Sequence, residues 1–434
     1  MSRLLIRNGR VIDPANGRDE TADVAIAAGR IVSIGASTGF TPERTLDASG
    51  FVVAPGFIDL SARLREPGFE YKATLESEML AAVRGGVTSL VCPPDTEPVL
   101  DEPGLVEMLK FRAQQLHQAH VYPLGALTLG LKGETITEMA ELCEAGCIAF
   151  GQADYPITDT QVLLRAMQYA HTFGYTVWLR PQDRWLGAGG VAHSGPMAAR
   201  LGLGGVPVMA ETVALHTIFE LVRLTGCRVH LCRLSSAAGV DLLRAARTEG
   251  LPVTSDVGAH HLHLSDIDIG YFDPMMRFTP PLRSTRDRDA LRAGVADGTI
   301  DAICSDHTPV DDDEKLLPFA EASPGATGLE LLLSLALKWA SEDGHSIVDA
   351  IARITRDPAC VLGAANLPHG AGTLGVDAPA DLCVFDPQAA WKVEPKALAS
   401  QGKNTPFRGY ELTGQALLTI VGGSLAWDAG RLPG

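Results

Sequence analysis

Charged and polar side chains follow directly after short apolar segments at several points of this sequence. They are Ser61, Arg63, Arg65, Asp95, Gln152, Arg180, Gln182, Arg233, His260, His261, Asp306 and His307. A hydrolytic metal centre needs neutral imidazoles and carboxylates, whose lone pairs bind the ion. Arginine is prominent here instead, and a guanidinium has no acceptor lone pair with which to bind a metal. The residue types therefore argue against a conventional hydrolytic metal centre.

Three of the arginines are expected to meet. Arg63, Arg180 and Arg233 each end a different apolar segment, so the folded chain would bring their guanidiniums near one point. Two such groups about 4 Å apart repel each other by roughly 4 kcal/mol at an effective dielectric constant of about 20. We therefore expect a bound anion, or the Asp306 carboxylate, between the three arginines. Asp306 itself is expected to pair with Arg180 or Arg233.

Two other groups of residues could do chemistry. His260, His261 and His263 form a dense histidine cluster, but strand alternation separates His260 from the other two. Asp256 is the only evident acidic partner, so we expect a structural role for the cluster. Ser61 could be a nucleophile, but no GxSxG elbow surrounds it and its arginine neighbours cannot act as general bases. We expect no nucleophilic serine here.

The segments that position these residues alternate between two periodicities. Short apolar runs, typical of buried strands, cover residues 56–62, 86–94, 120–127, 147–152, 176–182, 228–236, 252–261 and 302–309. Longer segments of helical period lie between them, at residues 74–86, 158–174, 210–226 and 329–337. Eight strands with intervening helices predict an α/β protein with a closed (β/α)8 TIM barrel. An open, doubly wound sheet is the alternative, although no GxGxxG motif follows the first strand.

The two ends of the chain have a different character. Both alternate apolar and polar residues and are divided by glycine, asparagine and aspartate, which is typical of antiparallel strands. We expect a small composite β-sandwich domain built from residues 1–53 and 366–434. The barrel domain would then cover residues 54–365. Its chemistry is expected at the C-terminal ends of the strands.

Composition narrows the class of protein. Lysine and arginine number 36 against 52 aspartates and glutamates, which gives a net charge of −16. This acidity argues against a nucleic-acid partner, because a binder of phosphates needs a basic face. No apolar run reaches the roughly 18 residues of a membrane span, and the N-terminal segment lacks a signal-peptide core. The 8 cysteines include no CxxC pair. We expect a soluble, cytoplasmic protein with reduced thiols and no membrane partner.

Several motifs resemble one enzyme family in sequence order. They are APGFIDLSARLREPG and its continuation to Asp101, HLCRLSS at 230–236, PVTSDVGAHHLHLS at 252–265, FTPPLR at 278–283, AICSDHTP at 302–309, GATGLELLL at 325–333 and NTPFRG at 404–409. Together they span nearly the whole chain and resemble the dihydroorotases of type I in the amidohydrolase superfamily. The resemblance implies a β/α barrel with a composite sheet domain, which agrees with the periodicity.

The resemblance fails at the family's metal ligands. The corresponding positions are Ser61, Arg63, Gln152, Arg180, Arg233 and Asp306, and only Asp306 keeps the residue type that the family uses. Asp154 lies one position too late to replace the missing aspartate at Ala153. The resemblance therefore implies no metal ligand set, no confident catalytic residue and a vestigial Asp306.

The positions that the family uses toward its substrate are mixed. Arg65, which would meet the substrate carboxylate, is kept. Asp95 and Thr279 stand where the family has asparagines, and Val310 stands where it has a histidine. A carboxylate at position 95 would repel an anionic substrate. These residues are interpreted as a vestigial substrate site.

The resemblance implies a catalytically inactive dihydroorotase homologue of pyrimidine biosynthesis. For such homologues it implies a structural role, as the partner of aspartate carbamoyltransferase in a homo- or hetero-oligomer, with no cofactor. Two alternatives stay open. One is an active dihydroorotase with an altered metal site, which would use zinc. The other is a protein that binds a small anion in its arginine-rich pocket.

Overall fold

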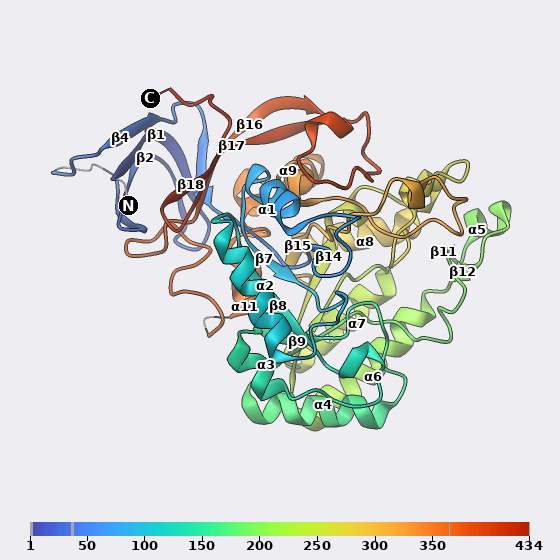
Figure 1. Ribbon diagram of the computed structural model, residues 1–434. Coiled ribbons are helices and arrows are strands. Elements are labelled where there is room, and N and C mark those ends of the chain that lie inside the picture. The colour runs from blue at the N-terminus through green and yellow to red at the C-terminus, as the bar shows by residue number, and fades with distance from the viewer. Residues whose placement is uncertain (1–2, 36–38, 364, 434) are drawn as a thin grey trace.

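The computed structural model describes residues 3–35, 39–363 and 365–433. Its main element is a ring of eight parallel strands surrounded by helices (Figure 1). In chain order the strands are β6 (Phe57–Asp59), β7 (Val87–Cys92), β8 (His120–Ala126), β9 (Ala149–Gly151), β10 (Thr176–Leu179), β13 (Arg228–Leu231), β14 (Val253–Gly258) and β15 (Ala302–Cys304). Each strand lies within one of the eight predicted segments. The predicted (β/α)8 barrel is confirmed.

The barrel strands are buried because helices cover them. Every residue of β6, β7, β9 and β15 is buried, as expected for parallel strands whose outer face is packed under helices. The covering helices are α1 (Leu75–Arg84), α2 (Pro103–Gln115), α3 (Met139–Ala145), α4 (Thr160–Phe173), α6 (Met209–Thr225), α7 (Ala237–Glu249), α8 (Thr285–Ala296), α9 (Leu332–Asp343), α10 (Ile347–Ala352) and α11 (Arg356–Leu362). None of the helices in the described ranges is both long and apolar enough to span a bilayer.

Local sequence signals begin and end these helices. Asp159 caps α4, because its carboxylate accepts a hydrogen bond from the backbone N–H of Gln161 at 2.8 Å. Gly174 ends the same helix with φ 73°, a left-handed conformation that glycine adopts without steric cost. The chain then turns directly into β10. Left-handed glycines also end α3, α6 and α7 before the chain enters the next strand.

The barrel closes between its first and last strands just beyond their ends. The main chain of Ala62 pairs in parallel with that of His307. The Asp59 carboxylate accepts hydrogen bonds from the Ser305 backbone N–H at 2.8 Å and from the Ser305 hydroxyl. A buried carboxylate therefore takes part in closing the ring.

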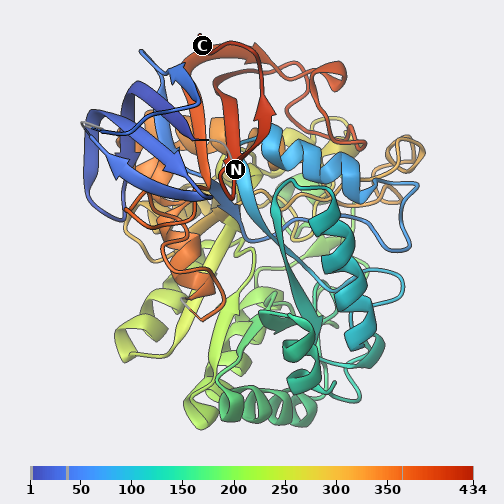
Figure 2. The same cartoon turned by 60° about the vertical axis from the view of Figure 1, so that its left-hand side comes forward.

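A second sheet joins the two ends of the chain. Its strands are β1 (Leu4–Asp13), β2 (Arg18–Ala27), β3 (Arg30–Ile34), β4 (Arg44–Asp47), β5 (Val52–Pro55), β16 (Leu382–Lys392), β17 (Glu411–Val421) and β18 (Ser424–Asp428). The order is β18-β17-β16-β5-β1-β2-β3, with β4 paired to β1. Figure 2 shows the blue and red strands side by side. The predicted domain boundary at residue 53 falls inside β5, and the chain enters the barrel at Gly56.

The terminal sheet has its own apolar core and also packs on the barrel. Ile6, Val24 and Leu382 are fully buried within it. The long hairpin of β16 and β17 extends over α1 and α9 (Figure 1). There Trp391 Nε1 donates a hydrogen bond to Ser334 Oγ at 3.1 Å, and that hydroxyl donates to the Gly414 carbonyl at 2.7 Å. The two parts of the molecule therefore share a polar contact within an apolar interface.

Candidate functional site

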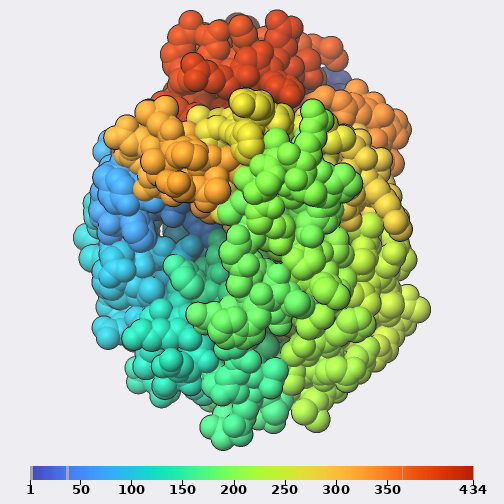
Figure 3. Space-filling model, turned by 90° about the vertical axis from the view of Figure 1, so that its right-hand side faces the viewer, coloured from blue at the N-terminus to red at the C-terminus, as the bar shows by residue number. Residues whose placement is uncertain are grey.

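The loops that follow the barrel strands form the mouth of the barrel. In the space-filling view of this face, blue, green and orange parts of the chain border a hollow (Figure 3). Several residues other than glycine in these loops have a positive φ, among them Arg65 at 63°, Ala153 at 47°, Arg233 at 55° and Asp306 at 47°. This conformation is costly for a residue with a Cβ, so surrounding contacts must hold it. It turns the chain sharply where the charged side chains meet.

Asp154 lies at the centre of the mouth. Its Oδ1 accepts hydrogen bonds from Arg233 Nη2 at 2.5 Å and from Arg180 Nε at 2.6 Å. Its Oδ2 accepts one from Arg63 Nη2 at 2.7 Å. A single carboxylate thus binds all three of the predicted arginines. These arginines, which end up after β6, β10 and β13, do converge on one point.

Two further aspartates complete the cluster. Asp95 Oδ2 accepts a hydrogen bond from Arg63 Nε at 2.7 Å. Asp306 Oδ1 accepts one from Arg233 Nη1 at 3.1 Å and lies 3.7 Å from Arg63 Nη1. Three guanidiniums therefore face three carboxylates, and the formal charges of the cluster cancel.

Burial makes this balance energetically important. The side chains of Arg63, Arg180 and Arg233 are 6%, 4% and 5% exposed. Burial alone would raise the pKa of the Asp154 carboxyl, but the three guanidiniums outweigh it and hold that pKa well below its usual range. Burial raises the pKa of the Asp306 carboxyl, and its attraction to Arg233 and Arg63 offsets only part of that effect. Unpaired charges at such depth would each cost several kcal/mol, by order of magnitude.

The expectation for the centre of the mouth was correct in part. Asp306 does pair with Arg233, but it makes no ion pair with Arg180 in the described parts of the chain. Asp154, which sequence reasoning set aside as one position too late, binds all three arginines. The left-handed Ala153 makes this possible, because the turn moves the following side chain into the mouth. The need for a compensating acid near three buried arginines was the signal that could have identified it.

Two positions that correspond to metal ligands do not join the cluster. Gln152 turns toward the loop after β8, where its Nε2 donates hydrogen bonds to Thr128 Oγ1 at 2.8 Å and the Leu131 carbonyl at 2.9 Å. Ser61 is half-buried and borders a small cavity of about 30 Å³ beside Arg63 and Arg233. Neither side chain contacts Asp154 in the described structure.

The vestigial substrate positions are occupied by contacts within the chain. Arg65 Nε donates a hydrogen bond to the Pro309 carbonyl at 2.8 Å. Asp95 binds Arg63, as described above, so its charge is neutralised where an anionic substrate was expected to be repelled. The carbonyl of Thr279 accepts a hydrogen bond from Arg233 Nη1 at 3.2 Å. Arg65 itself forms no ion pair with a carboxylate within the described residues.

The donor set of the mouth does not fit a zinc ion. Arg63, Arg180 and Arg233 occupy the centre with protonated guanidiniums, which have no lone pair for a metal. The lone pairs of Asp154 and Asp306 are directed at these cations. A dication at this position would be repelled by three guanidinium charges, and the carboxylates that could bind it are already paired with those guanidiniums.

A second group of possible ligands lies deeper in the barrel. Among the described residues, the one group of three or more His, Cys, Asp or Glu side chains whose ligand atoms all lie within 4.8 Å of one another is His230, Cys232 and Asp256. Both ring nitrogens of His230 already have partners, Thr254 Oγ1 at 2.9 Å and Asp256 Oδ2 at 3.0 Å. Burial raises the pKa of the Cys232 thiol well above its usual value, so the sulfur is protonated. The group is held together by its own hydrogen bonds and does not present free metal ligands.

The histidine cluster at 260–263 is embedded in the packing. His260 stacks on Phe278 with ring centroids 4.1 Å apart. His261 Nε2 lies 3.2 Å from the Pro280 carbonyl, and His263 Nε2 lies 2.9 Å from the Leu335 carbonyl. Burial lowers the pKa of both His261 and His263 to about 4, so these rings are neutral near pH 7. Their contacts agree with the structural role expected from the sequence.

Behind the mouth, a buried network holds the loop that carries Asp306. His307 points away from the mouth, and its Nε2 lies 2.5 Å from Glu78 Oε2 on α1. Glu78 also accepts hydrogen bonds from the Ser400 hydroxyl at 2.7 Å and from the Gln401 backbone N–H at 2.9 Å. The sequence contained no signal for this network, because its members are far apart along the chain. Asp306 and His307 act in different places and do not form a dyad.

Comparison with known proteins assigns the family. A family profile described as dihydro-orotase-like matches residues 50–238, and one described as amidohydrolase family matches residues 208–426. A dihydroorotase-like protein of Pseudomonas aeruginosa is 45% identical over 424 residues, which cover 98% of this chain and 99% of the relative. The chain belongs to the dihydroorotase family of amidohydrolases. A dihydroorotase of Syntrophotalea carbinolica is 39% identical to this chain over 425 residues, which cover 98% of this chain and 99% of the relative.

Solved structures support the same fold for this dihydroorotase homologue. L-hydantoinase (dihydropyrimidinase) from Arthrobacter aurescens matches it with a TM-score of 0.88 and 25% identity, over 100% of this chain and 98% of the other. A D-hydantoinase (dihydropyrimidinase) from a Thermus species matches with a TM-score of 0.83 and 22% identity, over 99% and 96%. The dihydroorotase homologue therefore has the amidohydrolase barrel, with an ion-pair cluster at its mouth.

Proposed function

We propose that this dihydroorotase homologue does not catalyse hydrolysis and serves as a structural partner of aspartate carbamoyltransferase in pyrimidine biosynthesis, in the cytoplasm. The observation that carries the proposal is the binding of Asp154 to Arg63, Arg180 and Arg233. Metal-dependent hydrolysis of a cyclic amide needs a metal ion that lowers the pKa of a bound water to about 7. Guanidiniums cannot bind that metal, and the carboxylates of the mouth are already paired with guanidiniums.

The rim of the mouth supports a role in association. Three of the most exposed large apolar side chains follow barrel strands: Trp185 after β10 is 73% exposed, Tyr271 after β14 is 92% exposed and Leu316 after β15 is 82% exposed. A contiguous exposed apolar patch is typical of a protein interface, and these three side chains all lie in loops at the mouth end of the barrel. We propose that this rim contacts the transferase.

Metal analysis tests the loss of hydrolysis. The protein is expressed with added zinc and purified, its metal content is measured, and turnover of dihydroorotate is followed in both directions. We expect no stoichiometric zinc and no turnover, while an active dihydroorotase prepared in parallel shows both. One or two tightly held zinc ions together with turnover would favour the alternative of an active dihydroorotase with an altered metal site.

Assembly with the transferase tests the structural role. The transferase from the same source is purified with and without this chain, and its size and activity are compared. We expect one complex whose interface exceeds roughly 1,000 Å². Leu316→Glu should weaken the complex, whereas Leu224→Glu, at a 68% exposed position at the end of α6, should leave it intact. A transferase that assembles and works normally alone would contradict the proposal.

The anion-binding alternative receives less support from the geometry. The three arginines of the mouth are neutralised by Asp95, Asp154 and Asp306. A small anion would have to displace a carboxylate of the chain itself. This alternative would gain support if the transferase did not associate with the chain.

A further inference from the structure

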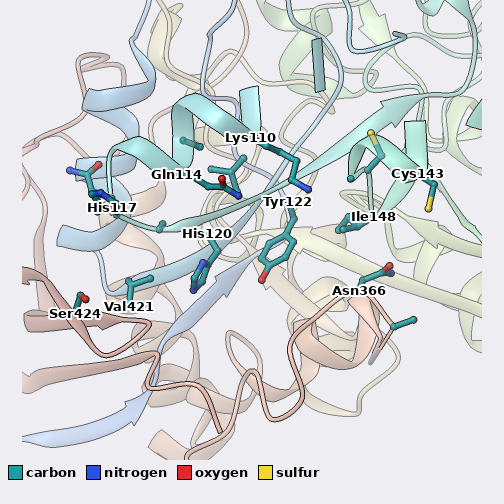
Figure 4. Close-up of a pocket in the computed structure, with 17 residues that line it drawn as sticks. Lys110, Gln114, His117, His120, Tyr122, Cys143, Ile148, Asn366, Val421 and Ser424 are labelled. Carbon is teal, nitrogen blue, oxygen red and sulfur yellow. The ribbon is translucent and has the colours of Figure 1, made fainter. Parts of the chain in front are cut away.

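A large cavity lies at the other end of the barrel, away from the mouth. Its volume is about 710 Å³, which is within the range of small-molecule sites. It is bordered by the C-terminal part of α2, the start of β8, the segment after α3 and residues of the terminal sheet. Figure 4 shows side chains from all of these around one space. Small-molecule sites often lie between domains in this way.

The cavity has a basic lining in an acidic protein. Lys110, His117 and His120 line it, and no aspartate or glutamate is among the described residues that do so. The chain as a whole has a net charge of −16. Lys110 forms no ion pair with any carboxylate in the parts of the chain that the structure describes. An unpaired ammonium in a concave site attracts anions.

His120 and Tyr122 add hydrogen-bond donors to the cavity lining, and Asp381 holds the His120 ring. His120 Nε2 lies 3.2 Å from Asp381 Oδ2, which orients the ring and leaves Nδ1 free to face a ligand. Burial and the hydrogen bond to Asp381 act in opposite senses, and the net result is a raised pKa for the His120 imidazole. Burial raises the pKa of the Tyr122 hydroxyl to about 12, so it stays a neutral donor. In Figure 4 the two rings hang side by side from β8.

Gly146 gives the Lys110 ammonium its place beside the cavity. A Cβ at this position would lie only 1.8 Å from Lys110 Nζ. The φ of Gly146 is 112°, which side chains rarely tolerate, so the residue both ends α3 and leaves room for the ammonium. Glycine at this position therefore leaves room for the Lys110 side chain to lie beside the cavity.

One lining residue has an unsatisfied acceptor. The side-chain oxygen Oε1 of Gln118 is buried and has no hydrogen-bond partner among the described residues. An acceptor left in this state costs about 1–3 kcal/mol. Because this oxygen is shielded from solvent, the Gln118 side chain must rotate toward the cavity before a ligand hydroxyl can donate to it, and the hydrogen bond gained would favour such a ligand. Sulfate, which is fully deprotonated near neutral pH, has no such donor, whereas a hydroxyl group does.

We propose that this cavity binds a small hydroxylated anion, with its anionic group on Lys110 and His120 and a hydroxyl group on Gln118. A sugar phosphate and a hydroxycarboxylate share this chemistry. The site is independent of the ion-pair cluster at the mouth and of the proposed loss of hydrolysis. It also joins the barrel to the terminal sheet, because Ser424, the first residue of β18, lies on its border.

Isothermal titration of the full-length protein with three probes tests the site. The probes are ribose 5-phosphate, gluconate and uncharged ribose. We expect at least one of the two anions to bind and ribose to bind at least about tenfold more weakly, since charge-assisted hydrogen bonds to the anion would be lost. Binding of ribose 5-phosphate alone or of gluconate alone identifies the anionic group. Equal binding of ribose, or binding of none of the three, would overturn the proposal.

Variants locate the binding within the cavity. Lys110→Met should weaken the bound anion about tenfold, the loss expected for one charge-assisted hydrogen bond. Lys132→Met removes the same charge at an exposed position after β8, outside the cavity, and should leave binding within about twofold. Gln118→Leu should weaken ribose 5-phosphate but not sulfate, which carries no hydroxyl hydrogen near neutral pH. Unchanged binding in both Lys110→Met and Gln118→Leu would overturn the site, and circular dichroism confirms that each variant is folded.

Discussion

The Asp154 carboxylate accepts a hydrogen bond from Arg233 Nη2 at 2.5 Å and thereby joins the loop after β9 to the loop after β13. The same carboxylate binds Arg180 in the loop after β10 and Arg63 in the loop after β6. In the ring, β10 lies between β9 and β13. One aspartate thus connects four loops at the mouth. The positive charges that exclude a metal also hold the barrel end together.

Asp154→Asn should destabilise the protein by about 3 kcal/mol, because it leaves three buried guanidiniums with two carboxylates. We take the lower end of the cost of breaking a buried pair, since the Asp154 side chain is 29% exposed. Urea unfolding at pH 7 measures the change. Asp241→Asn, which breaks an ion pair at a 76% exposed side chain, should cost less than about 1 kcal/mol. Equal effects of the two substitutions would argue against a central role for Asp154.

Restoring two histidines should not restore hydrolysis. In the double variant Ser61→His, Arg63→His, the guanidiniums of Arg180 and Arg233 still occupy the centre of the mouth. We expect neither zinc uptake nor turnover of dihydroorotate, measured by elemental analysis and by absorbance. Substantial turnover in this variant would show that the remaining arginines do not prevent metal binding.

Asp59 should make the protein less stable as the pH rises from about 4 to about 6. Burial raises the pKa of its carboxyl to about 6, from an ordinary value of 3.8, although hydrogen bonds from Ser305 and Ser61 oppose this. A raised folded-state pKa means that the stabilisation is complete below the unfolded-state value and is lost as the pH rises through the folded-state value. The shift corresponds to about 3 kcal/mol.

Urea unfolding of wild type and Asp59→Asn across this pH range isolates the contribution of Asp59. The asparagine side chain does not titrate, so the unfolding free energy of the variant should fall less between about pH 4 and pH 6. Other titrating groups contribute equally to both proteins and cancel in the difference. Parallel pH profiles would show that Asp59 ionises as easily in the folded state as in the unfolded state.

Glu78→Gln should loosen the segment around Ser400. Glu78 binds His307, the Ser400 hydroxyl and the Gln401 backbone N–H, and its side chain is fully buried. Removing the buried charge should destabilise the protein by about 3 kcal/mol and speed limited proteolysis within residues 395–405. Glu76→Gln on the exposed face of α1 changes the same residue type two positions away and should alter neither quantity. Equal proteolysis rates in the two variants would contradict the account.

The sign of the pH effect at Glu78 also follows from its contacts. Burial alone would raise the pKa of its carboxyl, but the hydrogen bond and charge of His307 and the hydrogen bonds from Ser400 and Ser77 lower it overall. The stabilisation is therefore present above the unfolded-state pKa and is lost as the pH falls through the folded-state pKa. Urea unfolding of wild type should show this loss at acid pH, and Glu78→Gln should not.

Much of the fold could be predicted from the sequence because burial leaves a local pattern. The apolar runs at residues 86–94 and 302–309 contain β7 and β15. The helical segment that ends at Gly174 and the apolar run that begins at Thr176 mark the turn from α4 into β10. The types of residue at positions 63, 180 and 233 also argued against a metal ligand set from the sequence alone. Residue type and periodicity are properties of single positions and short segments, so no tertiary contact is needed to recognise them.

Only the tertiary structure decided which charges meet. The sequence favoured Asp306 as the partner of the arginines, whereas the left-handed turn at Ala153 brings Asp154 to all three. Gln152, which stands at a position that corresponds to a metal ligand of the family, binds the loop after β8. These contacts join residues from different strands, and closure of the ring together with a few strained dihedral angles sets their distances. Such long-range geometry has no counterpart in the local pattern of the chain.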